Sequence, residues 1–211
     1  MKKFVLSLVI SLSLVLAYSS ISAAKRPKFT GPLGCKCHKP NLDDWEQSRH
    51  GKAFNTLLKK KRSKQVKKAI KKAAKVHPKL KLDYKKDYSD DDRCLKCHTT
   101  GYDQPGGYVD KESDPKLRGV GCEMCHGPGS EYRMIHKEKG DTPENLYTRA
   151  EIKAAGQTFP KDDSKICKNC HEGEGNPFTA KTDEKYMFNY DEMIKLDKSW
   201  HKINKLLFEH K

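Results

Sequence analysis

The stretch from Cys94 to His126 decides how this chain folds, because it holds two complete copies of one short motif. The first copy reads CLKCH at positions 94–98 and the second reads CEMCH at positions 122–126. Each is Cys-x-x-Cys-His, the attachment signal of a c-type haem. Two thiols one helical turn apart form thioethers with the haem vinyl groups, and the adjacent histidine ligates the iron. The stretch therefore predicts two haem sites close together in the sequence.

Two further copies flank this stretch. CKNCH at 167–171 is complete, whereas CKCH at 35–38 lacks one spacer residue. Numbered in chain order, the motifs predict four covalently attached haem c groups, haem 1 to haem 4. The candidate thioether cysteines are Cys35, Cys37, Cys94, Cys97, Cys122, Cys125, Cys167 and Cys170, and the candidate proximal ligands are His38, His98, His126 and His171.

Zinc is the alternative ligand for paired cysteines, since Cys94 and Cys97 with Cys122 and Cys125 could form a four-cysteine zinc knuckle. Against zinc, the second cysteine of all four pairs is followed directly by histidine. All eight cysteines belong to these pairs, so none remains for a structural disulfide. The pattern favours haem.

The N-terminus predicts export. A basic start at Lys2 and Lys3 precedes an apolar run over 4–17, and small residues lead to Ala24. Residues 1–24 are therefore expected to be a Sec signal peptide, with a retained N-terminal anchor as the alternative. Residues 25–211 would then form one tetrahaem cytochrome c domain in the periplasm, with no lipid anchor.

The composition provides too few apolar residues for an ordinary hydrophobic core. Hydrophobic residues make up 35% of the chain and charged residues 34%, a balance that is unfavourable for a compact fold. Haems resolve this conflict because their macrocycles take the buried place of apolar side chains. We expect a mainly α fold: a compact multihaem cytochrome c with short helices and long loops wrapped around four haems.

The charge predicts an acidic partner. The formal net charge is +15, which draws a protein to acidic protein surfaces or anionic membranes. Nucleic acid is not expected as a partner of an exported haem protein. The segment Lys59 to Lys75 is rich in lysine and contains no acidic residue. It is expected to form a helix that stops at Pro78, and that helix is either a solvated face or a docking surface.

Five histidines lie outside the motifs. Three of them fall in expected helices and are candidate distal iron ligands: His50 in a helix beginning near Asp44, His136 in a helix over 131–137, and His201 in a final helix beginning near Tyr190. His77 is expected at the surface, and His210 lies at the chain end. Three distal ligands for four haems leave one iron five-coordinate.

In the order and spacing of its motifs, the chain resembles the cytochrome c-554 family, tetrahaem electron carriers associated with hydroxylamine oxidoreductase. The similarity covers nearly all of residues 25–211. It rests on Trp45-x-x-x-x-His50-x-Lys52-Ala53, LDYKKDY before Cys94, GVGCEMCHGPG around the third motif, His136, Asn176-Pro177-Phe178-Thr179 and the closing KYMFNYDEM at 185–193.

The resemblance implies a ligand set for each iron. Haem 1 would take His38 and His136, haem 3 would take His126 and His201, and haem 4 would take His171 and His50. Haem 2 would have His98 alone, with Pro177 and Phe178 over its open face.

The first motif departs from the family pattern, which has Cys-x-x-Cys-His at this site. With Cys37 and His38 in their normal places, the usual first cysteine position is Gly34, and Cys35 is displaced by one residue. Either the loop distorts to form both thioethers, or Cys37 alone bonds to the haem. Loss of this haem is a third reading.

Two functions remain open. The leading hypothesis is a non-enzymatic electron carrier, because bis-histidine haems lack an open coordination position. It would pass electrons from a hydroxylamine-oxidoreductase-like donor towards a membrane quinone-linked cytochrome. The alternative is a reductase that acts on nitric oxide or a related nitrogen species at haem 2.

Overall fold

The computed structural model describes residues 26–139 and 147–195, and within them the fold is helical. The predicted mainly α class is confirmed, since the described extended pairing is a single isolated bridge between Thr99 and Arg118. The α-helices are α2 (Lys39–Gln47), α3 (Lys64–Val76), α4 (Asp92–His98), α5 (Cys122–His126), α6 (Tyr132–Lys139), α7 (Arg149–Ala154), α8 (Lys165–His171) and α9 (Tyr190–Met193). Short 3-10 helices connect them: η1 (Pro32–His38), η2 (Ala53–Thr56), η3 (Lys59–Lys61), η4 (Pro78–Leu80), η5 (Pro115–Leu117) and η7 (Glu184–Tyr186).

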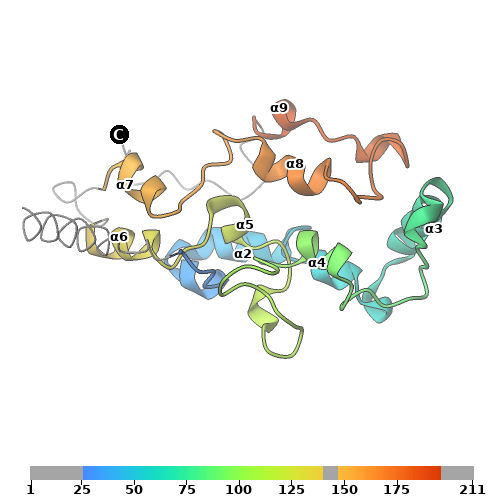
Figure 1. Ribbon diagram of the computed structural model, residues 1–211, viewed down its shortest axis with the longest axis horizontal. Coiled ribbons are helices and arrows are strands. Elements are labelled where there is room, and N and C mark those ends of the chain that lie inside the picture. The colour runs from blue at the N-terminus through green and yellow to red at the C-terminus, as the bar shows by residue number, and fades with distance from the viewer. Residues whose placement is uncertain (1–25, 140–146, 196–211) are drawn as a thin grey trace, which may run out of the picture.

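The helices are distributed along an elongated molecule, and their order in space differs from their order in the sequence. Figure 1 shows α6 and α7 towards one end and α3 at the other, with α2, α5, α4 and α8 between them. Helix α5 lies against both η1 and α8. Elements far apart in the sequence therefore meet in the middle of the molecule. None of the helices in the described ranges is both long and apolar enough to cross a membrane.

In the described part of the chain, most buried apolar residues belong to two small clusters. One contains Phe54, Leu57, Tyr88, Leu95, Tyr108 and Leu117, and the other contains Tyr132, Tyr147 and Ile152. These clusters are small for a chain of 211 residues, in agreement with its low apolar content. Leu95 belongs to α4, so the first cluster supports a helix that carries an attachment motif.

The prediction of a helix from Asp44 through His50 is wrong at both ends. Helix α2 begins at Lys39 with proline in its first turn, where a missing N–H costs nothing. It stops at Gln47 because Ser48 is extended, and the Ser48 hydroxyl accepts a hydrogen bond from the Gly51 amide. A Cβ on Gly51 would lie 2.2 Å from the Trp45 carbonyl oxygen. The chain thus turns sharply, and His50 lies in the turn rather than on a helix.

The lysine-rich segment forms two helices instead of one. Helix α3 begins after Ser63, whose hydroxyl caps the Val66 amide, and η3 precedes it as a separate turn. The helix ends at Val76, shortly before Pro78, as predicted. Two apolar residues of this helix, Ile70 and Ala73, are buried.

The C-terminal helices agree in part with the sequence. Helix α6 matches the helix expected over 131–137, and Thr148 and Glu151 form a capping box at the start of α7. The sequence predicts that this second helix starts at Pro143, and that position lies outside the described residues. So does most of the final helix, including His201. The signal peptide and His210 also lie outside them.

Candidate haem sites

Each complete attachment motif ends an α-helix. Helices α4, α5 and α8 finish at His98, His126 and His171, respectively. In an α-helix, residues three apart lie about 60° apart around the axis. The two cysteines of each motif are therefore on one face, as two thioethers to one haem edge require.

The shortened motif lies on a different kind of helix. Residues 32–38 form the 3-10 helix η1, and the backbone departs from helical angles at Cys35, with φ −103° and ψ 16°. In a 3-10 helix, positions two apart lie about 120° apart around the axis. The missing spacer residue therefore changes the local geometry of the first site.

Contacts between thiols connect the four motifs. The sulfur of Cys35 is hydrogen-bonded to that of Cys122, which raises the pKa of Cys35 and lowers that of Cys122. A second bond, between Cys97 and Cys170, lowers the pKa of Cys97 to about 7 and raises that of Cys170.

The third link joins the motifs of haems 3 and 4. Burial, together with the nearby Cys167, raises the pKa of Cys125 to about 11. Taken together, the two hydrogen bonds join the first motif to the third and the fourth to the second, and the packing of α5 against α8 joins the third to the fourth. The spatial order of the four sites is thus 1, 3, 4, 2, which differs from their order in the sequence.

The donor set does not form a zinc site. Within the described residues, no three His, Cys, Asp or Glu side chains converge on a point that could hold a metal ion. The cysteines whose side chains are described are free thiols. A haem requires no such cluster, because its thioethers and its axial histidine bond to different parts of the group.

His50 and His171 lie at a spacing that suits two ligands of one iron. Their ring centroids are 6.1 Å apart, and the planes of the two rings cross at 74°. Two imidazoles on opposite sides of one metal, with bonds of about 2.0 Å and ring centres about 1 Å further out, have centroids about 6 Å apart. The spacing therefore fits an iron between them and supports the predicted pairing for haem 4.

The surroundings of these two rings keep them neutral. Burial, and secondarily the neighbouring His171, lowers the pKa of His50 to about 4. Burial also lowers the pKa of His171. Neutral imidazole is the form that ligates metals. The position of His50 is fixed by its carbonyl, which accepts a hydrogen bond from the Val120 amide just before α5.

His98 is oriented for ligation through one nitrogen. Its Nδ1 lies 2.9 Å from the Ala53 carbonyl oxygen and 3.3 Å from the Thr56 hydroxyl. Since a carbonyl only accepts, Nδ1 carries the proton, and Nε2 is the nitrogen available to an iron. Such an outer hydrogen bond fixes the tautomer and the ring plane of a ligating histidine. Burial lowers the pKa of this imidazole as well.

The remaining predicted ligands are only partly placed. The ring of His136 stacks on Tyr147 at 4.4 Å and 13°, and it is tilted against Tyr132 at 5.7 Å. His38 is exposed where η1 meets α2. The pairs His38 with His136 and His126 with His201 remain predictions; His201 lies outside the described residues, and the ring contacts of His136 given above are with Tyr132 and Tyr147.

The segment Asn176 to Phe178 is held beside the fourth motif. The Asn176 amide donates to the His171 carbonyl at 2.8 Å, and its oxygen accepts from the Phe178 N–H at 2.9 Å. The Phe178 ring meets Tyr186 edge to face at 5.6 Å. Because Cys170 contacts Cys97 of the second motif, the segment begins close to both sites.

His77 was expected at the surface, and that prediction is wrong. The residue is half-buried, and its Nε2 lies 2.9 Å from the hydroxyl of Thr182. Thr182 is 2% exposed and donates to the Pro177 carbonyl at 2.6 Å. His77 therefore connects α3 to the segment that contains Phe178.

Sequence reasoning missed Glu123, a spacer residue of the third motif. Its carboxylate is 2% exposed and accepts hydrogen bonds from the Thr30 amide and hydroxyl, the Gly31 amide and the Gly129 amide. The distances lie between 2.7 and 2.9 Å. Through Thr30 and Gly31, Glu123 thus holds the N-terminal segment that precedes η1 against α5. An acidic residue in a motif position that accepts any residue gave no signal in the sequence.

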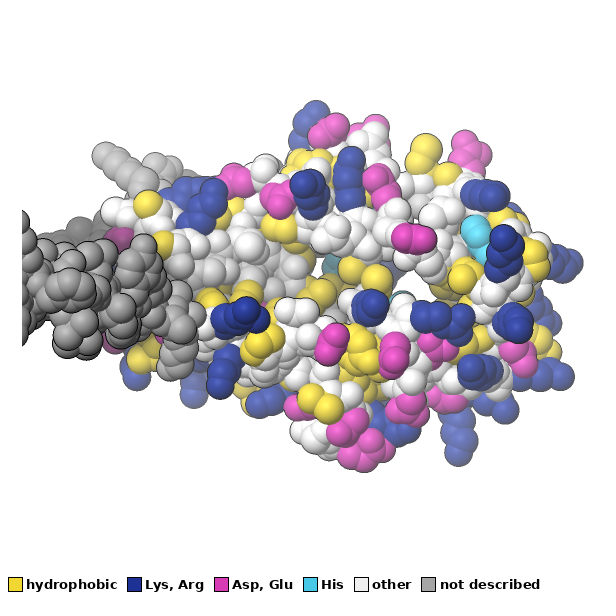
Figure 2. Space-filling model, in the orientation of Figure 1, with side chains coloured by type: hydrophobic (Ala, Val, Ile, Leu, Met, Phe, Trp, Pro, Cys, Tyr) yellow, Lys and Arg dark blue, Asp and Glu magenta, His cyan; other side chains and the backbone are white. Residues whose placement is uncertain are grey.

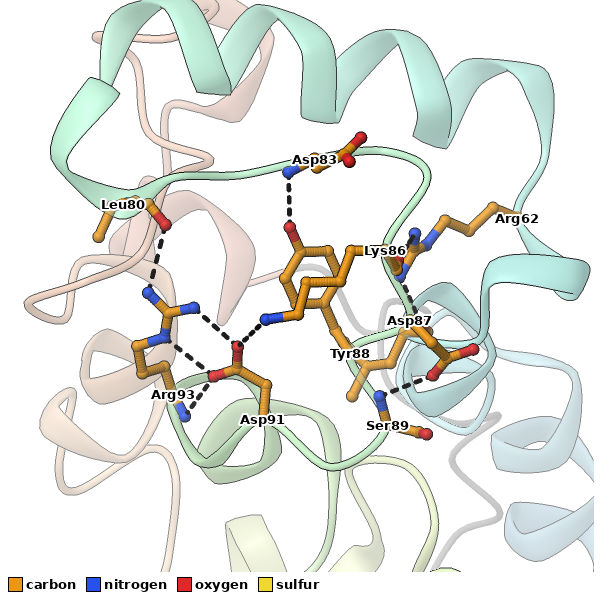
Figure 3. Close-up of polar contacts among 10 residues, drawn as sticks. Arg62, Leu80, Asp83, Lys86, Asp87, Tyr88, Ser89, Asp91 and Arg93 are labelled. Carbon is orange, nitrogen blue, oxygen red and sulfur yellow. Dashed lines mark hydrogen bonds and ion pairs between the residues drawn. The ribbon is translucent and has the colours of Figure 1, made fainter.

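Arg62 was also missed, although it supports the turn that orients His98. It is 5% exposed, and its guanidinium donates to the carbonyls of Thr56, Leu57, Tyr84 and Lys86. Figure 3 shows it reaching the loop that carries Tyr88, whose ring lies 5.1 Å from the guanidinium carbon. These bonds join η2 to the segment that leads into α4.

A helical chain whose helices end in haem-attachment motifs, brought together through their thiols, is a multihaem c-type electron-transfer cytochrome. The family model described as "Cytochrome c554 and c-prime" matches residues 34–127. The chain is 35% identical to cytochrome c-554 of Nitrosomonas europaea over 206 residues, which cover 89% of this chain and 81% of that protein.

The fold agrees with a solved structure of the same kind. The reduced state of cytochrome c554 from Nitrosomonas europaea superimposes with a TM-score of 0.72 at 37% identity, covering 86% of this chain and 88% of that one. This chain belongs to the cytochrome c-554 family, and the family implies covalently bound haem c.

Proposed function

We propose that this protein is a periplasmic electron carrier with four haems, exported by the signal peptide at residues 1–24. The observation that carries the proposal is the proximity of the four motifs, through the Cys35–Cys122 and Cys97–Cys170 hydrogen bonds and the packing of α5 against α8, in the order 1, 3, 4, 2. Cofactors attached at such neighbouring points lie close together and conduct electrons along the molecule. The chain's own residues contribute ligands, a low-polarity environment and a fixed order of sites.

The donor we propose is an oxidoreductase that releases several electrons at once, of the hydroxylamine-oxidoreductase type. The acceptor we propose is a quinone-linked cytochrome of the membrane. A carrier that holds four electrons matches such a donor, because one encounter can accept all the electrons of one oxidation. The positive net charge supports an acidic partner.

The test is stopped-flow reduction of the oxidised holoprotein by purified hydroxylamine oxidoreductase and hydroxylamine. We expect reduction of several haems within a single mixing experiment, at a rate that falls as salt is added. Reduction no faster than that of a monohaem cytochrome c of similar charge would count against a dedicated multi-electron carrier.

A second candidate is reduction of nitric oxide at haem 2. It is favoured by the placement of His77, whose Nε2 is hydrogen-bonded to the Thr182 hydroxyl at 2.9 Å. In this reaction two nitric oxide molecules, two electrons and two protons give nitrous oxide and water. Catalytic nitrous oxide formation with a chemical electron donor would support it, whereas stoichiometric binding of nitric oxide without product would leave the carrier function.

A further inference from the structure

The outer face of α3 carries a ridge of lysines. Positions Lys64, Lys68, Lys71 and Lys75 recur at helical spacing, and all four side chains are exposed. On the opposite face, Ile70 and Ala73 are buried. The helix is therefore amphipathic, and its exposed face is predominantly basic.

The helix is fixed to the rest of the molecule by residues on its flank and at its end. Lys72 is paired with Asp183 at 3.0 Å, and His77 contacts Thr182 at 2.9 Å. The Lys71 amine lies 4.2 Å from the centre of the Tyr84 ring. These contacts bind α3 to two other segments of the chain, so the ridge is presented on a rigid support. Lys72 and Lys71 therefore already interact with other residues of this chain.

The rest of the ridge is available for binding. Within the described residues, Lys64, Lys68 and Lys75 take part in no ion pair, and no acidic residue occurs between positions 59 and 75. Figure 2 shows basic side chains gathered over the end of the molecule where α3 lies. Such a patch attracts an acidic protein surface and speeds its association.

The ridge lies at the haem 2 end of the series of sites. The Arg93 guanidinium, on the helix that carries the second motif, donates to the Leu80 carbonyl in η4, directly after α3 (Figure 3). The second motif is in turn the terminal site in the order 1, 3, 4, 2. A partner seated on α3 would therefore be nearest to haem 2.

We propose that an acidic redox protein docks on the lysine ridge of α3 and exchanges electrons at the haem 2 end of the molecule. This inference rests on the proposed carrier function and adds the location of the docking surface. A membrane is a poorer occupant, because a helix that enters a bilayer interface needs exposed apolar residues beside its lysines. The large hydrophobic residues exposed in the described chain are Leu33, Val109, Met134 and Met187, none of which belongs to α3.

The experiment compares two double variants of the holoprotein with equal net charge. Lys64→Glu/Lys68→Glu changes the ridge, and Lys153→Glu/Lys161→Glu changes exposed lysines in and after α7, towards the other end. Reduced flavodoxin serves as the acidic one-electron donor, and the second-order rate is measured by stopped flow. At low ionic strength we expect the ridge variant to react about tenfold more slowly than the wild type and the control to stay within about twofold. The difference should disappear at high salt.

A second readout does not depend on electron transfer. Carbodiimide joins carboxylates of flavodoxin to lysines that lie in the interface, and peptide mass spectrometry should find the links at Lys64, Lys68 or Lys75. Equal slowing of both variants, or links spread over the whole surface, would overturn a local docking site. Preferential binding of the ridge to phosphatidylglycerol vesicles, lost in the ridge variant while its rate with flavodoxin is kept, would replace the protein partner by a membrane. If the wild type accepts electrons from no acidic donor, the carrier function itself fails.

Discussion

His77 donates its Nε2–H to the hydroxyl of Thr182 across 2.9 Å. The direction follows from Thr182, whose single hydroxyl proton is given to the Pro177 carbonyl at 2.6 Å. A nitrogen that carries a proton cannot coordinate a metal. The Nε2 of the histidine that caps α3 is therefore occupied as a structural donor, so this nitrogen is not available to the iron of haem 2.

The first prediction is that haem 2 is five-coordinate and high-spin, while the other three haems are low-spin. His50, His136 and His201 are assigned to other irons, and His77 is bound to Thr182. We expect one high-spin component in the ferric electron paramagnetic resonance spectrum, unchanged in the variant His77→Ala. A spectrum that is low-spin throughout, or one that gains a high-spin component in that variant, would refute the assignment.

The second prediction concerns access to that iron. If Phe178 covers the open face, Phe178→Ala should bind nitric oxide several-fold faster than the wild type, as measured by flash photolysis or stopped flow. Val109→Ala is the matched control, because Val109 is 73% exposed and lies away from the segment. Equal rates in all three proteins would show that Phe178 does not limit binding.

The third prediction tests the pairing of His50 with His171. Removing the distal imidazole in His50→Ala should convert haem 4 from low-spin to high-spin, because the 6.1 Å spacing of the two rings leaves room for one iron. Added imidazole should restore the low-spin spectrum. A variant that stays low-spin without imidazole would mean that His50 ligates no iron.

The fourth prediction is that all four haems are covalently bound and that haem 1 is held through Cys37 alone. The backbone departs from helical angles at Cys35, and the missing spacer residue displaces this thiol from the position of the first cysteine in a complete motif. Intact mass after acid–acetone extraction should show four haems in the wild type and in Cys35→Ala but three in Cys37→Ala. The pyridine haemochrome of the wild type should be red-shifted by the one vinyl group that remains. Three haems in Cys35→Ala would instead show that Cys35 forms a required thioether.

The fifth prediction concerns the buried carboxylate. Glu123→Gln removes the charge that accepts four hydrogen bonds and turns an amide N–H₂ towards backbone donors. We expect the free energy of unfolding to fall by about 3 kcal/mol, measured by guanidinium denaturation of the holoprotein. Glu112→Gln, at an exposed site, is the control and should differ by less than about 0.5 kcal/mol. Equal stability of the two variants would mean that the Glu123 hydrogen bonds add nothing net.

The sequence predicted those features that depend on local spacing. The motif helices followed from Cys-x-x-Cys-His, because only one helical turn brings both thiols to one haem edge. The pairing of His171 with His50 was implied by the family resemblance, whereas the turn that contains His50 was not predicted. The proline beside Lys39 favours the early start of α2, whereas the extended Ser48 and the tight approach of Gly51 to Trp45 end it before His50.

Long-range contacts could not be predicted in this way. The partner of His77 is 105 residues away and the first donor to Glu123 is 93 residues away. Neither pair shares a periodic pattern, because each contact is created by packing of loops. The spatial order of the four sites was hidden for the same reason, since the thiol contacts join motifs that are not neighbours in the sequence.

The hydrogen bonds from Thr30 and Gly31 to Glu123 have a consequence for biogenesis. If residues 1–24 direct export, as proposed, Thr30 and the first motif would leave the translocon early, and Glu123 would emerge more than 90 residues after Thr30. Until then, the first Cys-Lys-Cys-His cannot be held against α5 and remains an unfolded substrate for the haem-attachment machinery. An irregular motif, which is slow to align, is thereby given the longest time in which to react. Completion of the third motif then closes this interval, and the molecule matures from its middle outwards.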